Sequence, residues 1–243
     1  MAYRLPPTHA RIDWSNPIAN GLTFAFSCHQ VQGWSSQSAW VNAVTGAMGA
    51  ATLGAGGYRT SQGYRIDSTI GYLDNYFEAT AKGVSAISGF TLTSLANTGR
   101  LVTTRGNASQ SAGWMFSIVN TGSIRITMGD GSTAASVNSA TSTVTANTPY
   151  IAGFTLNPND SNRTEIYLDG RQVASGTAAG IGGVVPSAIP RISFGAEMTS
   201  GGAVSSDIIG NIQFAYAWSR LLTPEEMRQL AIDPYCFWTW EGK

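Results

Sequence analysis

Charged residues are scarce in this sequence. Only 12% of its 243 residues are Asp, Glu, Lys or Arg, about half of the roughly 25% found in an ordinary soluble domain. The 14 basic side chains balance the 14 acidic ones, so the formal net charge is zero. Recognition of phosphates needs an excess of basic residues, and we therefore expect no nucleic-acid partner.

Long hydrophobic runs are also missing. No window approaches the roughly 18 consecutive apolar residues of a membrane-spanning helix. Residues 1–14 contain no apolar stretch that could serve as a secretory signal. We therefore expect no membrane partner, and synthesis in a cytoplasm without a signal peptide.

Residues that commonly bind metals are few. Cys28 and Cys236 are the only two cysteines, and in a reducing cytoplasm two thiols are favoured over a disulfide. His9 and His29 have no acidic or thiol neighbours at metal-ligand spacing. The sequence predicts no metal centre built on these four side chains.

Glycine, by contrast, is plentiful, with 28 residues, which is typical of a chain with many turns. Apolar and polar residues alternate in many segments, and this period of two predicts half-buried strands. The clearest examples are residues 22–28, 114–118 and 124–128, with hairpin turns at residues 120–123 and 169–170. These patterns predict an all-β fold of packed antiparallel sheets.

The longest alternating run covers residues 208–218 and predicts a central strand. Apart from Ile209, its large apolar residues are at even positions, so we expect them on one face: Ile208, Ile212, Phe214, Tyr216 and Trp218. The only well-marked helix follows this strand. Thr223 is a suitable N-cap, Pro224 fits the first turn, and Glu226 completes a capping box. This pattern predicts a short helix over residues 223–231.

Four blocks in the C-terminal part resemble the laminin G-like branch of the concanavalin A-like lectin/glucanase superfamily. They are residues 147–155, 164–175, 190–196 and 210–226, and the second contains Tyr-Leu-Asp-Gly while the fourth runs from a Gly-x-Ile strand into Leu-Thr-Pro-Glu-Glu. The resemblance extends over about residues 21–231. It implies a jelly-roll sandwich of two antiparallel sheets with one short C-terminal helix.

The two ends of the chain carry a narrower resemblance. Residues 12–23, Ile-Asp-Trp-Ser-Asn-Pro-Ile-Ala-Asn-Gly-Leu-Thr, and residues 233–238, Asp-Pro-Tyr-Cys-Phe-Trp, are similar to the ends of laminin G-like proteins of tailed phages. We therefore expect an extended N-terminal arm over residues 1–20, a sandwich over residues 21–234 and an aromatic tail over residues 235–243.

Glucanases of this superfamily use two carboxylates on one strand, in the pattern Glu-x-Asp-x-x-Glu, because alternate residues point into one cleft. That pattern is absent here. The acidic residues considered are Glu165, Asp169, Glu197, Glu225 and Glu226, and none has the required spacing. We therefore predict no catalytic residues and a protein that is not an enzyme.

We expect no cofactor. Calcium is the alternative, because many relatives hold it with Asp and Asn oxygens. The acidic pair that the resemblance implies would fall on Gln213 and Phe214, which cannot replace it. Residues 157–162 and 130–131 are also rich in Asn and Asp, but these are the ordinary residues of turns.

Aromatic residues gather at both ends, and exposed aromatic groups often mark contact surfaces. The candidate assembly contacts are Tyr3, Arg4, Arg11, Trp14, Tyr235, Trp238 and Trp240. The alternative is that the aromatic residues close the bottom of the sandwich core.

Three functions follow from these observations. The leading hypothesis is a non-enzymatic virion structural protein of a tailed phage, such as a capsid decoration protein. Its partners would be other virion proteins, including the major capsid protein, and further copies of itself. The second hypothesis is a carbohydrate-binding module for host-surface glycans. A glycan-cleaving enzyme is the weakest of the three.

Overall fold

The computed structural model describes residues 10–28, 40–53, 58–60, 63–66, 69–74, 83–104, 112–181, 191–198, 204–205 and 208–239. Strands make up more than a third of the chain, and the structure is a sandwich of two antiparallel sheets, as predicted. No helix within these ranges is long and apolar enough to cross a membrane.

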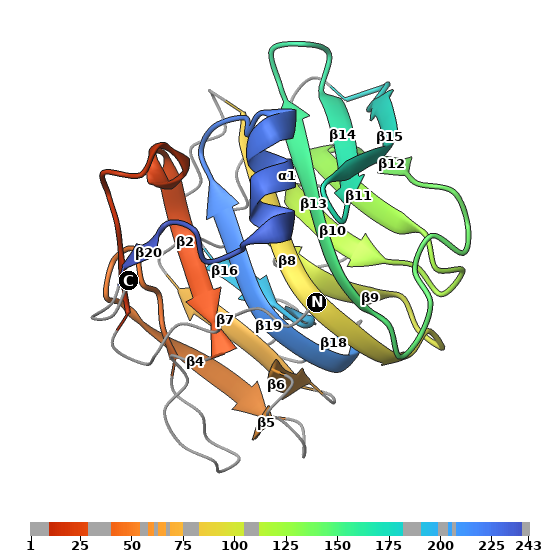
Figure 1. Cartoon of the computed structure of the whole chain (residues 1–243). Helices are drawn as coiled ribbons and strands as arrows, with labels where there is room; N and C mark the ends of the chain where they lie inside the picture. Colours follow the sequence, from red (N-terminus) through yellow and green to blue (C-terminus); the bar gives the residue numbers. More distant parts are fainter. Residues whose placement is uncertain are drawn as a thin grey trace.

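Two eight-stranded sheets form the layers of the sandwich (Figure 1). Sheet I contains, in spatial order, β12 (Ala134–Asn138), β11 (Ile124–Asp130), β10 (Ala112–Ile118), β9 (Gly99–Thr103), β16 (Arg191–Phe194), β7 (Thr69–Asp74), β4 (Met48–Leu53) and β3 (Trp40–Val41). Sheet II contains β15 (Arg171–Thr177), β14 (Arg163–Leu168), β13 (Pro149–Asn157), β8 (Val84–Ser94), β19 (Ile209–Trp218), β6 (Gly63–Ile66) and β5 (Tyr58–Thr60), with β2 (Leu22–Ser27) paired to β19.

Four short strands and two helices complete the described elements. β1 (Arg11–Ile12) pairs with β20 (Trp238–Thr239), and β17 (Glu197–Met198) pairs with β18 (Val204–Ser205). The 3₁₀-helix η1 (Pro17–Ala19) precedes β2, and the α-helix α1 (Pro224–Ile232) follows β19.

The first hydrophobic core lies between the sheets. Its large side chains come from alternate positions of facing strands and include Trp114, Phe116, Phe154, Ile126 and Phe194. The rings of Trp114 and Phe116 meet the ring of Phe154 edge to face, with centroids 5.2 and 5.3 Å apart. Burial of these apolar faces is the main stabilising contribution to the sandwich.

The face prediction for residues 208–218 was wrong. Ile208 and Ile212 point into the first core, whereas Phe214, Tyr216 and Trp218 belong to a second core on the opposite face of sheet II. The pairing of β19 with β8 shifts register between Ile212 and Phe214, and one extra residue in a strand moves all later side chains to the other face.

The second core is covered by α1 and by the C-terminal tail. The helix begins as predicted: the Thr223 hydroxyl accepts a hydrogen bond from the Glu226 backbone N–H, and the Glu226 carboxylate accepts one from the Thr223 backbone N–H. Met227 and Leu230 are buried against sheet II. Figure 1 shows the helix lying across the front of β8 and β13.

Both ends of the described chain join this second core. In the part of the predicted arm that the structure describes, Ile12 and Ile18 are buried, so residues 10–20 belong to the sandwich and do not form an extended arm. In the tail, the Phe237 ring meets the Tyr216 ring edge to face, with centroids 5.1 Å apart. Cys28 and Cys236 form no disulfide.

Arg220 fastens the N-terminal segment to the helix. Its guanidinium donates hydrogen bonds to both carboxylate oxygens of Glu226, at 2.6 and 2.9 Å. It also donates to the backbone carbonyls of Asn20, at 2.6 Å, and Pro17, at 3.3 Å. One side chain therefore closes the contact between η1, the end of β19 and α1.

We predict that Trp218→Ala lowers the free energy of unfolding by about 3–5 kcal/mol. The Trp218 side chain is buried, its indole N–H donates to the Ile18 carbonyl at 2.7 Å, and its ring packs on Phe237. Urea denaturation measures the change. Trp14→Ala is the matched control, since Trp14 is 58% exposed, and a loss below about 1 kcal/mol for Trp218→Ala would contradict its place in the core.

We also predict that acid weakens the contact between Arg220 and Glu226. Burial raises the pKa of Glu226, but hydrogen bonds from Arg220 and Thr223 outweigh it, so the pKa lies below its ordinary value. A carboxylate with a lowered pKa stabilises the fold above its unfolded pKa of about 4.3, and this stabilisation is lost as the pH falls through the folded pKa.

The experiment compares urea denaturation of the wild type and Glu226→Gln between pH 3 and pH 7. The variant should be less stable by about 1–2 kcal/mol at neutral pH, and the difference should shrink below about pH 4. Glu225→Gln is the control, because Glu225 pairs with an exposed Arg228 and solvent screens that ion pair. A difference independent of pH would refute the ionic role of Glu226.

Candidate functional site

A row of polar side chains crosses the outer face of sheet I. The strand register sets Ser117 directly opposite Arg100 on one side and opposite Arg125 on the other, and Arg125 opposite Asn138. Their neighbours in sequence point into the first core, so these four side chains are on the outward face. The register thereby brings two arginines from separate strands, β9 and β11, onto one surface.

Arg125 is the accessible cation of this row. Its side chain is partly exposed, and Asn138 beside it is exposed. The Arg125 Nε donates to the Asn138 Oδ1 at 2.7 Å, which fixes the plane of the guanidinium. Among the described residues no hydrogen bond is made by its two terminal nitrogens. A guanidinium held in this way can bind a carboxylate through two parallel hydrogen bonds.

Arg100 is buried in an ion pair at the other end of the row. Its Nε donates to the Glu197 Oε2 at 3.2 Å, and the Glu197 side chain is fully buried. The second oxygen, Oε1, has no hydrogen-bond partner among the described residues. Gly195, with φ of 85°, makes the turn that brings Glu197 over β9 from the end of β16. Glu197 was considered from the sequence as an acid, but nothing in the spacing indicated Arg100 as its partner.

A second polar row runs beside the first. The Thr127 hydroxyl and the Ser136 hydroxyl lie 2.8 Å apart across β11 and β12. Ser136 is exposed, whereas Thr127 is 7% exposed. Of the described side chains on β9 to β12, the accessible ones on this face are therefore on β11 and β12, while those on β9 and β10 are buried.

The predicted assembly contacts separate into two groups. Arg11 and Trp14 are exposed at the junction where β1 pairs with β20. Tyr235 and Trp238 lie at the same junction but are 1% and 2% exposed, so they cannot serve as surface contacts. Their rings pack into the second core, because the turn after α1 directs the tail back onto sheet II. Tyr3, Arg4 and Trp240 lie outside the described residues.

The acidic residues considered as catalytic groups are held by separate partners. Glu165 accepts a hydrogen bond from the Tyr167 hydroxyl at 2.6 Å, and burial raises the pKa of that tyrosine. Asp169 lies in the turn between β14 and β15 and accepts from the Ile151 backbone N–H at 2.9 Å. Glu197 pairs with Arg100, while Glu225 and Glu226 pair with arginines at the start of α1. No two of them share a strand in the glucanase pattern.

The Asn- and Asp-rich loops are built as turns. Asp130 accepts hydrogen bonds from the backbone of Ser132 and Thr133 through the same oxygen, at 2.9 and 2.8 Å. In residues 157–162, Ser161 and Asn162 adopt positive φ, at 50° and 57°. In the part of the chain that the structure describes, no group of three or more His, Cys, Asp or Glu side chains could hold a metal ion.

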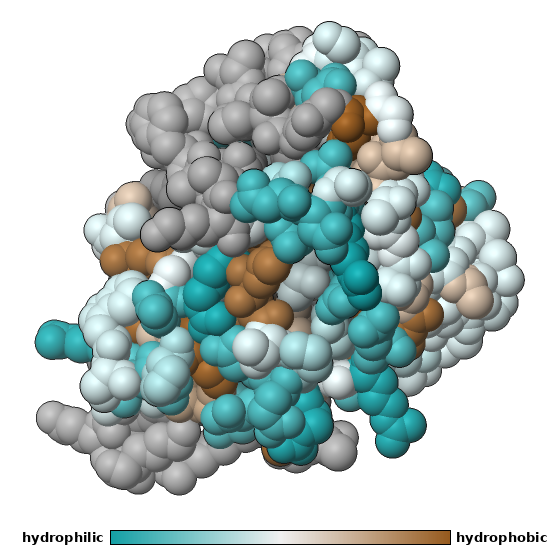
Figure 2. Space-filling view, turned by 90° about the horizontal axis from the view of Figure 1, so that it is seen from above, coloured by the Kyte–Doolittle hydropathy of each residue, from teal (hydrophilic) through white to brown (hydrophobic). Residues whose placement is uncertain are grey.

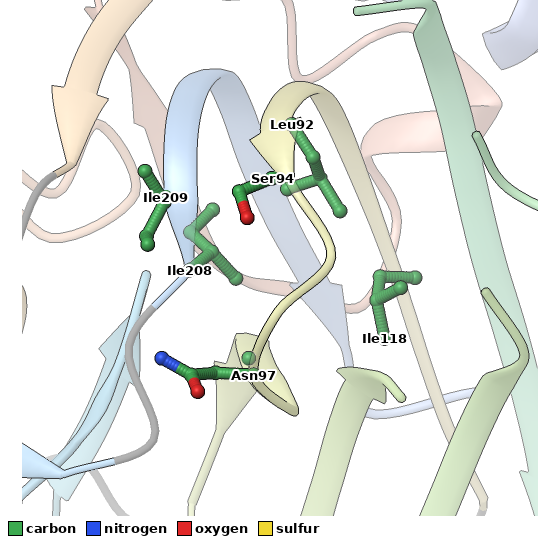
Figure 3. A pocket seen from close by; sticks show the side chains of 7 residues that line it. Leu92, Ser94, Asn97, Ile118, Ile208 and Ile209 are labelled. Carbon is green, nitrogen blue, oxygen red and sulfur yellow. The ribbon is translucent and has the colours of Figure 1, made fainter. Parts of the chain in front are cut away.

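A small pocket lies at one end of the sandwich (Figure 3). Ser94 and Asn97, near the connection from β8 to β9, line it together with Ile118, Ile208 and Ile209. It leaves room for about one water molecule, far less than a sugar ring requires. In the view of Figure 2, hydrophobic residues form small patches separated by hydrophilic ones. The outer face of sheet I is therefore the better candidate for a binding surface.

Comparison with known proteins adds to this geometry. The sequence model of the concanavalin A-like lectin/glucanases superfamily matches residues 70–228, more than half of the chain. The chain belongs to this superfamily. The laminin G-like resemblance of its C-terminal blocks is thereby confirmed. No curated protein sequence matches the chain.

Several solved structures share the fold. The CBM40 domain of the Ruminococcus gnavus IT-sialidase, bound to α2,3-sialyllactose, is 13% identical, with a TM-score of 0.52 over 62% of this chain and 83% of that one. The binding domain of botulinum neurotoxin serotype D is 13% identical, with a TM-score of 0.63 over 89% of this chain and 53% of that one. A Trypanosoma rangeli sialidase is 15% identical, with a TM-score of 0.63 over 90% of this chain and 33% of that one. At these identities the likeness concerns the fold, and the chain spans about half of the toxin domain and a third of that sialidase.

We predict that removing calcium has little effect on stability. Where the resemblance implies an acidic pair, the Gln213 amide donates to the Thr91 hydroxyl at 3.4 Å and Phe214 is buried in the second core. Addition of EDTA should therefore change the melting temperature by less than about 1 °C, because an ion that is not bound cannot stabilise the folded state. A larger fall that added calcium reverses would reveal an ion site and refute this expectation.

Proposed function

We propose that this protein is a non-catalytic glycan-binding domain whose ligands carry a carboxylate. The observation that carries the proposal is the partly exposed Arg125 guanidinium on the outer face of sheet I, oriented by Asn138 and with its terminal nitrogens directed to no described residue. A carboxylate matches the paired donors of a guanidinium in both charge and geometry.

Two further features support a glycan rather than another acidic ligand. Exposed hydroxyl and amide groups surround Arg125 on β12, namely those of Ser136 and Asn138, and such groups exchange hydrogen bonds readily with sugar hydroxyls. The net charge of zero disfavours nucleic acids and other polyanions. A single charged contact among neutral polar groups fits a saccharide with one acidic residue.

One of the similar structures supports this class of ligand. The Ruminococcus gnavus CBM40 domain is described as bound to α2,3-sialyllactose, a saccharide with one carboxylate. We propose the same chemical class here, on the basis of the chain's own arginine. We also propose that the protein does not cleave its ligand, because each candidate acid is engaged by an arginine, a tyrosine or the backbone.

The experiment measures binding of α2,3-sialyllactose and of lactose by isothermal titration calorimetry. We expect tighter binding of the sialylated sugar, and Arg125→Ala should abolish this difference, a loss of about tenfold or more. Arg125→Lys keeps the charge without the paired donors, so its preference for the sialylated sugar should lie between those of the wild type and Arg125→Ala.

Arg171→Ala is the matched control, because Arg171 is an exposed arginine on β15 of the other sheet. A panel with glucuronate- and galacturonate-containing oligosaccharides extends the test to other acidic sugars. If none of these sugars binds, or if Arg125→Ala and Arg171→Ala have equal effects, the proposed site is wrong.

A role in a phage virion remains a proposal from the sequence. It rests on the similarity of residues 12–23 and 233–238 to the ends of phage proteins. The burial of Tyr235 and Trp238 removes two of the surface contacts on which assembly would depend. A glycan-binding domain carried on a particle would satisfy both proposals.

A further inference from the structure

Trp14 is the most exposed large hydrophobic side chain among the described residues, at 58%. It lies in the turn between β1 and η1, at the junction of the chain's two ends. Every other tryptophan in the structure with a described side chain is buried. Exposing an indole loses the benefit of burying a large apolar surface, so its position requires an explanation.

The backbone that carries Trp14 is firmly held. The Asp13 N–H donates to the Phe237 carbonyl at 2.9 Å, and the Asn16 N–H donates to the Asp13 carbonyl at 3.1 Å. The Asn16 side chain donates to the Cys236 carbonyl at 3.1 Å. A ligand that binds the indole therefore finds a turn that is already ordered, and little conformational entropy is lost.

A carboxylate stands next to the indole in sequence. Asp13 uses one oxygen, Oδ1, to accept hydrogen bonds from the Ser15 N–H and hydroxyl, at 3.0 and 2.6 Å. These bonds hold the pKa of Asp13 below its ordinary value, so the group is ionised at neutral pH. The Asn16 backbone N–H also stabilises this carboxylate. Its other oxygen, Oδ2, accepts no hydrogen bond from a described side chain, and it can accept one from a ligand hydroxyl.

The described surroundings of Trp14 fit a small ligand better than a protein partner. A stable protein interface buries roughly 800 Å² on each partner, and its hot-spot residues cluster in well-packed pockets near the centre. The described neighbours of Trp14 in its turn are polar or small, and of the other exposed large hydrophobic residues, Val173 is on β15 and Ile232 is at the end of α1. One flat ring among polar groups is the arrangement that a sugar ring requires, because its C–H groups pack on the negatively polarised indole face.

We propose that Trp14 and Asp13 form a second binding site, specific for neutral pyranose sugars and distinct from the face around Arg125. The indole stacks on the C–H face of the sugar, and the Asp13 Oδ2 accepts a hydrogen bond from a sugar hydroxyl. The negative charge of Asp13 repels acidic sugars, so the two sites select ligands of opposite character. Figure 1 shows β20, which pairs with β1, on the side of the molecule opposite β11 and β12.

The experiment titrates the full chain with lactose, cellobiose and maltotriose, and follows binding by calorimetry. We expect at least one of these sugars to bind, and Trp14→Ala to weaken that binding by about tenfold or more. Trp14→Phe should keep part of the affinity. Asp13→Asn keeps the acceptor for Ser15 but loses the charge, and it should weaken binding less than Trp14→Ala.

Ile232→Ala is the matched control, because Ile232 is also a large exposed side chain, at 55%. The affinity of the Ile232→Ala variant for the sugar should stay within twofold of that of the wild type. All variants should keep the wild-type melting temperature. Absence of binding to all three sugars, or equal effects of Trp14→Ala and Ile232→Ala, would overturn the proposal. Self-association of the wild type that Trp14→Ala abolishes, without sugar binding, would show a protein contact instead. The three sugars carry no carboxylate, so the result does not depend on the site at Arg125.

Discussion

The segment containing η1, the helix α1 and the C-terminal tail form an outer layer over sheet II. This layer depends on the contact between Arg220 and Glu226. Arg220 stands where β19 ends, and its side chain reaches the carbonyls of Pro17 and Asn20 as well as the carboxylate that caps α1. The guanidinium donates to carbonyls at the C-terminal end of η1, and it neutralises a partly buried acid. The N-terminal segment, the central strand and the helix therefore hold one another in place.

This outer layer decides which surface is left for a ligand. The helix and the described N-terminal and C-terminal segments cover β19, β8 and β13 on the outward face of sheet II and bury the aromatic residues of β19 beneath them. On sheet I, the described side chains of β11 and β12 form an accessible polar surface, where small polar residues lie beside Arg125.

The same packing separates the aromatic residues near the chain ends into two kinds. Phe237 and Trp238 follow a turn that directs them onto sheet II, and they stabilise the fold. Trp14 lies in a turn fixed by hydrogen bonds to the tail and stays in solvent. Two tryptophans near the chain ends thus differ in role: Trp238 contributes to stability, and Trp14 is available for binding. The two proposed sites also differ in charge, one with a guanidinium and one with a carboxylate, so they complement each other.

The sequence by itself determined the fold class, the hairpins and the capped helix, because alternation and capping depend on residues close together in the chain. It also determined the absence of a glucanase pattern. Only the tertiary structure decided the rest. The register shift after Ile212 reversed the face of three aromatic residues, and a bulge leaves no mark in an alternating pattern. Arg100 and Arg125 came together through pairing with β10, and Trp14 stayed exposed while Trp238 did not, because long-range contacts set register and burial.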